Sequence, residues 1–64
     1  MTLAKAHKLQ AGDEVYWTDP DEGLCSHAVR ITEIDFVGNI VRLTGTDVQT
    51  GNECYLECFP NELT

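Results

Sequence analysis

Apolar and polar residues alternate along the longest β-prone stretch of the chain, but the alternation changes phase partway. Val29 and Ile31 share one parity, whereas Ile34 and Phe36 share the other. Because successive side chains of a strand point to opposite faces, a regular strand cannot bury both pairs on one side. A β-bulge at residues 32–33 would insert one residue and bring both pairs to the same face. The pattern therefore predicts one long bent strand, a feature that small closed barrels need.

The dipeptide Gly38-Asn39 follows this stretch and fits a two-residue hairpin turn. The turn predicts a register that places apolar residues opposite one another on one face and unlike charges opposite one another on the other. The pairs are Phe36 with Val41, Ile34 with Leu43, and Asp35 with Arg42. A shift by one residue would set Ile34 opposite Arg42, so the sequence favours this register.

A second hairpin is predicted by the segment 47–50, taken as a four-residue loop. This loop would pair Leu43 with Cys54, Val41 with Leu56, Arg42 with Tyr55, and Ile40 with Glu57. Parity then turns Cys54, Leu56 and Cys58 toward the core, and it turns Tyr55 and Glu57 to solvent. We therefore expect the two late cysteines to be buried thiols that behave as small hydrophobic residues.

Turn residues and termini complete the pattern. Pro20 and Gly23 predict a loop over 18–23, and the segment 59–63 predicts a short 3₁₀ turn. The predicted strands lie near 13–18, 27–37, 40–46 and 52–59, with a stub at the end, which is the order of an SH3-like barrel. We expect an all-β fold with a flexible N-terminal tail over 1–8 and a small five-stranded SH3-like barrel over 9–64. The short 3₁₀ turn would precede the last strand.

The chain has 64 residues, enough for one domain with a modest core. Four Lys or Arg residues stand against eleven Asp or Glu residues, and the formal net charge is -7. This balance argues against nucleic acid and anionic membrane as partners, because both attract Lys and Arg. It favours solubility or a basic protein partner, with imitation of DNA by carboxylates as a further alternative. Residues 1–10 hold no apolar run that would predict a signal peptide or membrane span, so we expect a cytoplasmic protein.

Cys25, His27, Cys54 and Cys58 are the candidate zinc ligands. The separation of Cys54 from Cys58 amounts to about 13 Å on an unbroken strand, which is too far for one ion. We therefore expect no metal and no cofactor, and a zinc-binding module that uses all four residues is the alternative. In a reducing compartment the three cysteines would remain thiols.

Catalytic chemistry has little support in the sequence. Ser26 and His27 are neighbours on a predicted strand and point to opposite faces, so they do not form a nucleophile–base pair. The acidic segment 19–23 lacks the third acid and the distant glutamate of a calcium loop, and we expect solvated turn carboxylates there, with weak cation binding as the alternative. We predict a non-enzymatic protein, and the alternative is a subunit of an oligomeric enzyme.

The aromatic residues predict a binding surface. Trp17 shares parity with Val15 and either closes one end of the core or lies at its rim beside an acidic loop. Exposed aromatic residues flanked by carboxylates suit a basic or proline-rich peptide. The candidate binding residues are Tyr16, Trp17, Asp19, Asp21 and Tyr55; a second candidate patch is Asp35, Arg42 and Tyr55. Outward Val37 and Ile40 add apolar surface suited to self-association or to a docking partner.

Three segments carry a resemblance to a known group of proteins. They are Leu9-x-x-Gly12-Asp13-x-Val15-x-Trp17, Asp19-Pro20-Asp21-x-Gly23-x-Cys25-Ser26, and Glu57-Cys58-Phe59-x-x-Glu62-Leu63. Together they resemble short bacterial, phage and plasmid proteins with a DPD-x-G-x-CS segment, which are treated as SH3-like barrels of unassigned function. The resemblance implies a small accessory protein, with a mobile element as its candidate source. A plasmid-encoded dihydrofolate reductase shares the fold, but its Val-Gln-Ile-Tyr strand is absent, and Cys54-Tyr55-Leu56-Glu57 stands in its place. The expected function is a protein-interaction module.

Overall fold

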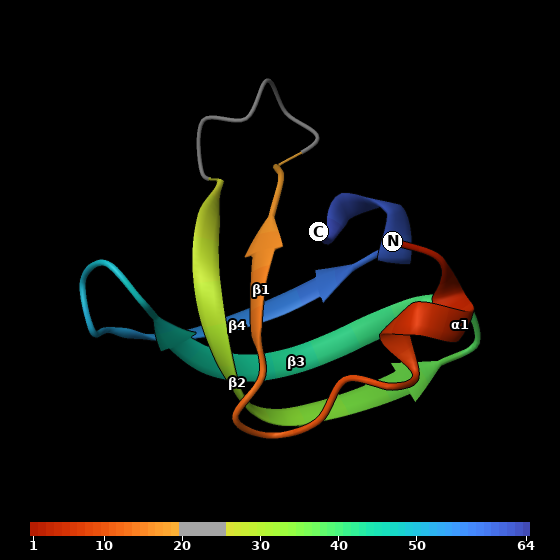
Figure 1. Ribbon diagram of the computed structural model, residues 1–64, viewed down its shortest axis with the longest axis horizontal. Helices are drawn as coiled ribbons and strands as arrows, with labels where there is room; N and C mark the ends of the chain where they lie inside the picture. The colour runs from red at the N-terminus through yellow and green to blue at the C-terminus, as the bar shows by residue number, and fades with distance from the viewer. Residues whose placement is uncertain (20–25) are drawn as a thin grey trace.

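The computed structural model describes residues 1–19 and 26–64 of the chain. In chain order the elements are α1 (Leu3–Ala6), β1 (Glu14–Trp17), β2 (His27–Val37), β3 (Ile40–Asp47), β4 (Glu53–Cys58) and the 3₁₀ turn η1 (Pro60–Glu62). The four strands form one antiparallel sheet in the order β1-β2-β3-β4 (Figure 1). The prediction of an all-β fold is therefore confirmed.

The bend predicted for β2 is present. The pairing of β2 with β3 shifts register between Ile31 and Glu33, which is the place where the change of parity predicted a bulge. Val29 and Ile31 are fully buried, and Ile34 and Phe36 are half-buried against the same core. One inserted residue thus lets a single strand bury both of its apolar pairs on one side.

The first hairpin has the predicted register. Phe36 pairs with Val41, Ile34 with Leu43, and Asp35 with Arg42. The turn at Gly38-Asn39 places Gly38 at a φ of 58°, a left-handed conformation that glycine adopts at little cost. The match follows from agreement of both faces, because this register opposes apolar residues inside and unlike charges outside.

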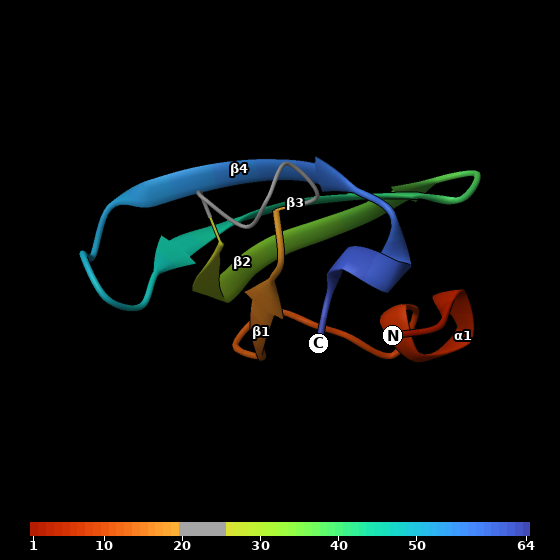
Figure 2. The ribbon, with the colours of Figure 1, turned by 90° about the horizontal axis from the view of Figure 1, so that it is seen from above.

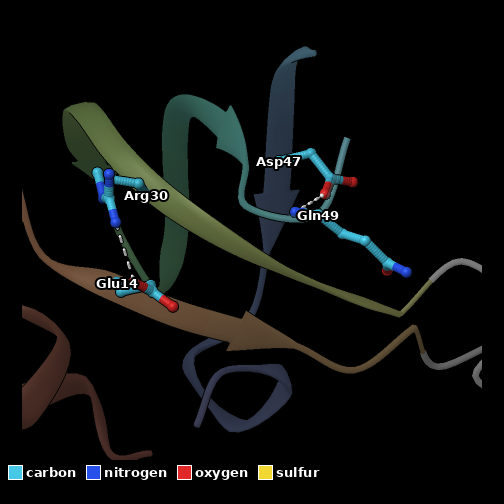
Figure 3. Close-up of polar contacts among 4 residues, drawn as sticks. All are labelled: Glu14, Arg30, Asp47 and Gln49. Atoms are coloured by element: carbon cyan, nitrogen blue, oxygen red, sulfur yellow. Dashed lines mark hydrogen bonds and ion pairs between the residues drawn. The ribbon is translucent and has the colours of Figure 1, made fainter. Parts of the chain in front are cut away.

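The second hairpin differs from its prediction by two residues. Leu43 pairs with Leu56 rather than Cys54, Val41 with Cys58, Arg42 with Glu57, and Thr44 with Tyr55. The loop occupies residues 48–51, and Asp47 caps it. Its Oδ1 accepts from the backbone N–H of Gln49 at 2.8 Å (Figure 3) and from that of Thr50 at 3.1 Å. Gly51 ends the loop with a φ of 79°. A shift of two keeps every side chain on its expected face, so Leu56 and Cys58 are still buried.

The core lies on the inner face of the sheet. Its buried members come from every strand and from both terminal segments: Ala6, Val15, Val29, Ile31, Val41, Leu43, Leu56, Cys58 and Leu63. In Figure 2, β2, β3 and β4 form an upper layer, and β1, α1 and the C-terminal segment lie beneath it. The termini therefore supply the second wall of the core.

Gly45 lies where β3 leaves no room for a side chain beside β2. A Cβ at this position would overlap the carbonyl oxygen of Arg30 and would lie 2.5 Å from Cγ1 of Val29, both on β2. No side chain fits these distances without movement of the backbone. Outside this contact, Arg30 reaches across to Glu14 of β1 in an exposed ion pair of 3.4 Å (Figure 3).

A short helix lies within the N-terminal segment 1–8. Thr2 caps the short helix α1 by accepting a hydrogen bond from the N–H of Lys5, and Ala6 is fully buried. The His7 ring stacks on Phe36 of β2, with 4.1 Å between centroids. Packing stabilises a helical turn that is too short to form alone. No helix among the described residues is long and apolar enough to cross a membrane.

The C-terminal residues take the place of the expected fifth strand. Leu63 forms an isolated bridge with Trp17, and Tyr16 and Thr64 exchange two backbone hydrogen bonds of 3.0 and 2.9 Å. The 3₁₀ turn that precedes them is present as η1, as predicted. The described residues thus hold four strands and a bridging segment, and their sheet remains open, whereas the sequence predicted a closed five-stranded barrel.

Candidate binding surface on the outer face of the sheet

The face of the sheet that points away from the core, here called the outer face, carries a shallow groove of about 200 Å³. Residues of β2, β3 and β4 line it: Glu33, Ile34, Asp35, Arg42, Thr44 and Tyr55. Alternation explains five of these positions, since Glu33, Asp35, Arg42, Thr44 and Tyr55 fall on the face opposite the core. Ile34 packs against the core and lies between Glu33 and Asp35 in the chain. We call this feature the outer groove.

A chain of hydrogen bonds crosses the outer groove. The Nε of Arg42 donates to the hydroxyl oxygen of Tyr55 at 3.0 Å, and that hydroxyl donates to Oε2 of Glu57 at 3.0 Å. The bond to Tyr55 raises the pKa of Arg42 above its ordinary value, and the charges of Glu57 and Asp35 contribute to the rise. Arg42 is therefore a permanent cation held by a tyrosine and two acids.

The electrostatic balance of the outer groove is negative. Glu33, Asp35 and Glu57 supply three carboxylates on this face, and Arg42 is the cation among them. Asp35 and Glu57 flank Arg42 in the sheet register, on β2 and β4 respectively. An exposed phenol among carboxylates can bind a cationic side chain by charge and by contact with the ring.

The predicted aromatic surface is divided by the fold. Tyr16 is 47% exposed on β1, and Tyr55 is 53% exposed on β4. These strands are the two edges of the sheet, and β2 and β3 lie between them. The structure therefore does not join Tyr16 and Tyr55 into one patch along the sheet.

Trp17 faces the core side, as its shared parity with Val15 predicted. Its ring is half-buried, packs against the core and meets the His27 ring edge-on at 5.6 Å. Asp19 lies just beyond β1, where its backbone N–H donates to Oγ of Ser26 at 2.9 Å. Asp21 lies outside the described residues. Of the two loop carboxylates predicted beside Trp17, the structure therefore describes only Asp19.

The second predicted patch is assembled in the structure. Asp35, Arg42 and Tyr55 all line the outer groove, although Tyr55 opposes Thr44 rather than Arg42. The sequence reasoning did not include Glu33 or Thr44, and it did not identify Glu57 as the acceptor for Tyr55. The parity of β4 could have indicated Glu57, because residues two apart on a strand share a face.

Cys54 and Cys58, the two cysteines among the described residues, show no arrangement suited to zinc. Within residues 1–19 and 26–64, no group of three or more His, Cys, Asp or Glu side chains is placed to hold a metal ion. Cys54 and Cys58 lie on the continuous strand β4, whereas His27 lies opposite Trp17 on β2. Burial raises the pKa of Cys58 to about 11, and the charge of Glu62 adds to it. The pKa of Cys54 is also raised, first by burial and second by the charge of Asp47. Cys25 falls outside the described residues.

Comparison with known proteins does not extend this description. The chain matches no protein-family model, no curated protein and no solved structure. Function must therefore be argued from the geometry and charge of the outer groove.

Proposed function

We propose that this chain is a non-enzymatic protein-interaction module that binds a basic segment of a partner protein in the outer groove. The observation that carries the proposal is the groove itself, in which an exposed tyrosine lies among three carboxylates of β2 and β4. Tyrosine provides contact area at low entropic cost, and carboxylates select a cationic side chain.

The charge of the whole molecule supports the same kind of partner. A formal net charge of -7 on 64 residues speeds the approach of a basic protein and repels nucleic acid and anionic lipid. The partner segment must compete with Arg42 for Tyr55 and the nearby acids, so binding includes an exchange of one cation for another. The groove is shallow, and this suits a transient complex.

A specific fold within the all-β class is part of the same proposal. We propose an SH3-like barrel in which residues 62–64 act as an abbreviated fifth strand, supported by their backbone hydrogen bonds to Tyr16 and Thr18. We also propose a small cytoplasmic accessory protein, and the accessory role is supported by the resemblance to short bacterial, phage and plasmid proteins. The alternative roles, a zinc-binding module or a subunit of an oligomeric enzyme, would show as bound metal in elemental analysis or as a stable tetramer in solution.

Short fluorescent peptides rich in Lys and Arg test the proposal, with acidic peptides of equal length as the control. Basic peptides should bind, and the affinity should fall steeply with added salt. Tyr55→Ala and Asp35→Asn should weaken binding. Tyr16→Ala is the matched control, because it removes an equally exposed tyrosine from the other edge strand and should leave binding unchanged. Equal loss in Tyr16→Ala and Tyr55→Ala, or no binding by any basic peptide, would overturn the outer groove as the site.

A further inference from the structure

The strand β4 has one edge that pairs with nothing in the described part of the chain. It is the last strand in the sheet order, so β3 occupies only one of its sides. The other edge of the sheet is different: β1 exchanges backbone hydrogen bonds with Thr64, and Thr18 donates to the carbonyl of Glu62. The two edges of this small sheet therefore differ in their capacity to pair with another strand.

The register shows which backbone groups of β4 point to its free edge. The N–H of Asp47 donates to the carbonyl of Asn52 at 2.8 Å, so these two residues form a hydrogen-bonded pair. Such pairs alternate along an antiparallel ladder, and the next ones are Gly45 with Cys54 and Leu43 with Leu56. The intervening residues of β4 direct their N–H and C=O groups away from β3. They are Glu53, Tyr55 and Glu57.

The same three residues carry the exposed side chains of β4. The burial pattern of the strand alternates, with Glu53, Tyr55 and Glu57 exposed and with Leu56 and Cys58 buried. The free edge thus combines backbone donors and acceptors with a row of acid, aromatic and acid on the outer face. A strand added at this edge would place its own side chains directly opposite that row.

We propose that β4 accepts an extended, basic segment of a partner protein as an additional antiparallel strand. This inference rests on the proposed function for its basic partner and for contact with Tyr55, and it places the segment as an extended strand along the free edge of β4. Lys or Arg would oppose Glu53 and Glu57, and an apolar or aromatic residue would oppose Tyr55. The partner segment therefore reads basic-x-apolar-x-basic, and its backbone completes the hydrogen bonds that Glu53, Tyr55 and Glu57 leave open on this side.

Charge selects this occupant over a second copy of the chain. Two copies each carry a net charge of -7, and pairing of two β4 strands about Tyr55 would set Glu53 opposite Glu57 of the copy. Like charges directly opposite destabilise a strand pair. The glutamates also protect the edge from unwanted pairing. They exclude acidic strands and admit basic ones.

The experiment uses a synthetic peptide with the core Lys-Thr-Val-Thr-Arg, in two N-methylated forms. Methylation of the central Val removes an N–H that faces Tyr55 and should lower affinity by about tenfold or more. Methylation of the adjacent Thr, whose N–H points away from β4, should be tolerated. In the protein, Glu53→Gln should lower affinity by about two- to fivefold, although Glu53 does not line the outer groove. Amide exchange should slow at Glu53, Tyr55 and Glu57 when the peptide binds.

The outcomes separate this inference from the proposed function. If the peptide binds but both methylated forms lose affinity equally, and exchange at the three amides is unchanged, strand addition is wrong while binding in the outer groove stands. If no basic peptide binds in any form, both proposals fail. A stable dimer of the free protein, with these amides protected in the absence of peptide, would show that a second copy occupies the edge instead.

Discussion

The indole nitrogen of Trp17 lies 3.2 Å from Oε1 of Glu62, and this contact joins β1 to the last turn of the chain. The other carboxylate oxygen of Glu62 accepts from the backbone N–H of Phe59 at 2.8 Å. One side chain therefore fixes both the start of η1 and the rim of the core. Packing against the core leaves the Trp17 ring half-buried.

Replacement of Glu62 with Gln should lower the free energy of unfolding by about 1 to 2 kcal/mol, because a neutral amide has one acceptor oxygen for two donors. Urea unfolding followed by Trp17 fluorescence measures the change. Glu33→Gln is the control, since Glu33 is exposed on the outer face, and it should stay within about 0.5 kcal/mol of the parent. Unchanged stability of Glu62→Gln would mean that backbone pairing alone holds the C-terminal segment.

Gly45 should tolerate no side chain. In Gly45→Ala, the new Cβ meets the backbone oxygen of Arg30 and the side chain of Val29, so we expect a loss of about 1 to 3 kcal/mol or a failure to fold. Gly38→Asn is the comparison, because nothing lies near a Cβ there and Asn accepts a left-handed conformation. Thermal unfolding of both variants should show a much larger loss for Gly45→Ala. Equal losses would contradict the close approach of β2 and β3.

Asp47 should set the register of the second hairpin. Asp47→Ala removes the acceptor for Gln49 and Thr50 and should cost about 1 kcal/mol, whereas Asp47→Asn keeps an acceptor oxygen and should cost less. Chemical denaturation measures both. Nuclear Overhauser contacts between Leu43 and Leu56 should persist in Asp47→Asn; contacts between Leu43 and Cys54 in the parent protein would show that the register is the other one.

Cys58 should make stability depend on alkaline pH. Its pKa is raised from 9.0 to about 11, so the folded chain keeps a proton that the unfolded chain loses. The folded state binds more protons between these values, and the free energy of unfolding should therefore fall as pH rises from about 9 to about 11. Below this window the contribution of Cys58 is fully present and constant.

Denaturation midpoints measured below and inside that window test this expectation. Cys58→Ala should show a shallower fall than the parent protein, since the group that gains its proton on folding is gone. Alkylation by iodoacetamide, read by mass spectrometry of peptides, should modify Cys54 before Cys58, because Cys58 is the more buried thiol. Faster reaction at Cys58 would contradict its burial.

The two hairpins show what the sequence could and could not determine. In the first, the two-residue turn at Gly38-Asn39 and side-chain polarity indicate the same register, because a slip of one residue would have set Ile34 against Arg42. In the second, the predicted and observed registers differ by two, and both keep the same residues inside. Only the capping by Asp47 and the left-handed Gly51 distinguish them, and these are properties of the turn.

The alternation of apolar and polar residues predicted which face of the sheet a residue lies on better than it predicted which residues lie beside it. It placed Tyr16 and Tyr55 outward, but it carried no information on strand order, which separates them onto opposite edges. The helical turn α1 was not predicted because it is stabilised by burial of Ala6 and by the stacking of His7 on Phe36, both contacts with distant parts of the chain. Asp35, Arg42 and Tyr55 were predictable as a patch because they share one face.

The hydrogen bonds between Tyr16 and Thr64 have a consequence for association. They occupy the side of β1 that a neighbouring molecule would need in order to continue the sheet, while β4 on the opposite side remains available. When a second molecule pairs with β4 through its own β4, its far edge is β1, which Thr64 already occupies. Growth of a fibril by repeated lateral addition therefore stops after the first step, and any complex built through this sheet is limited to a single pair.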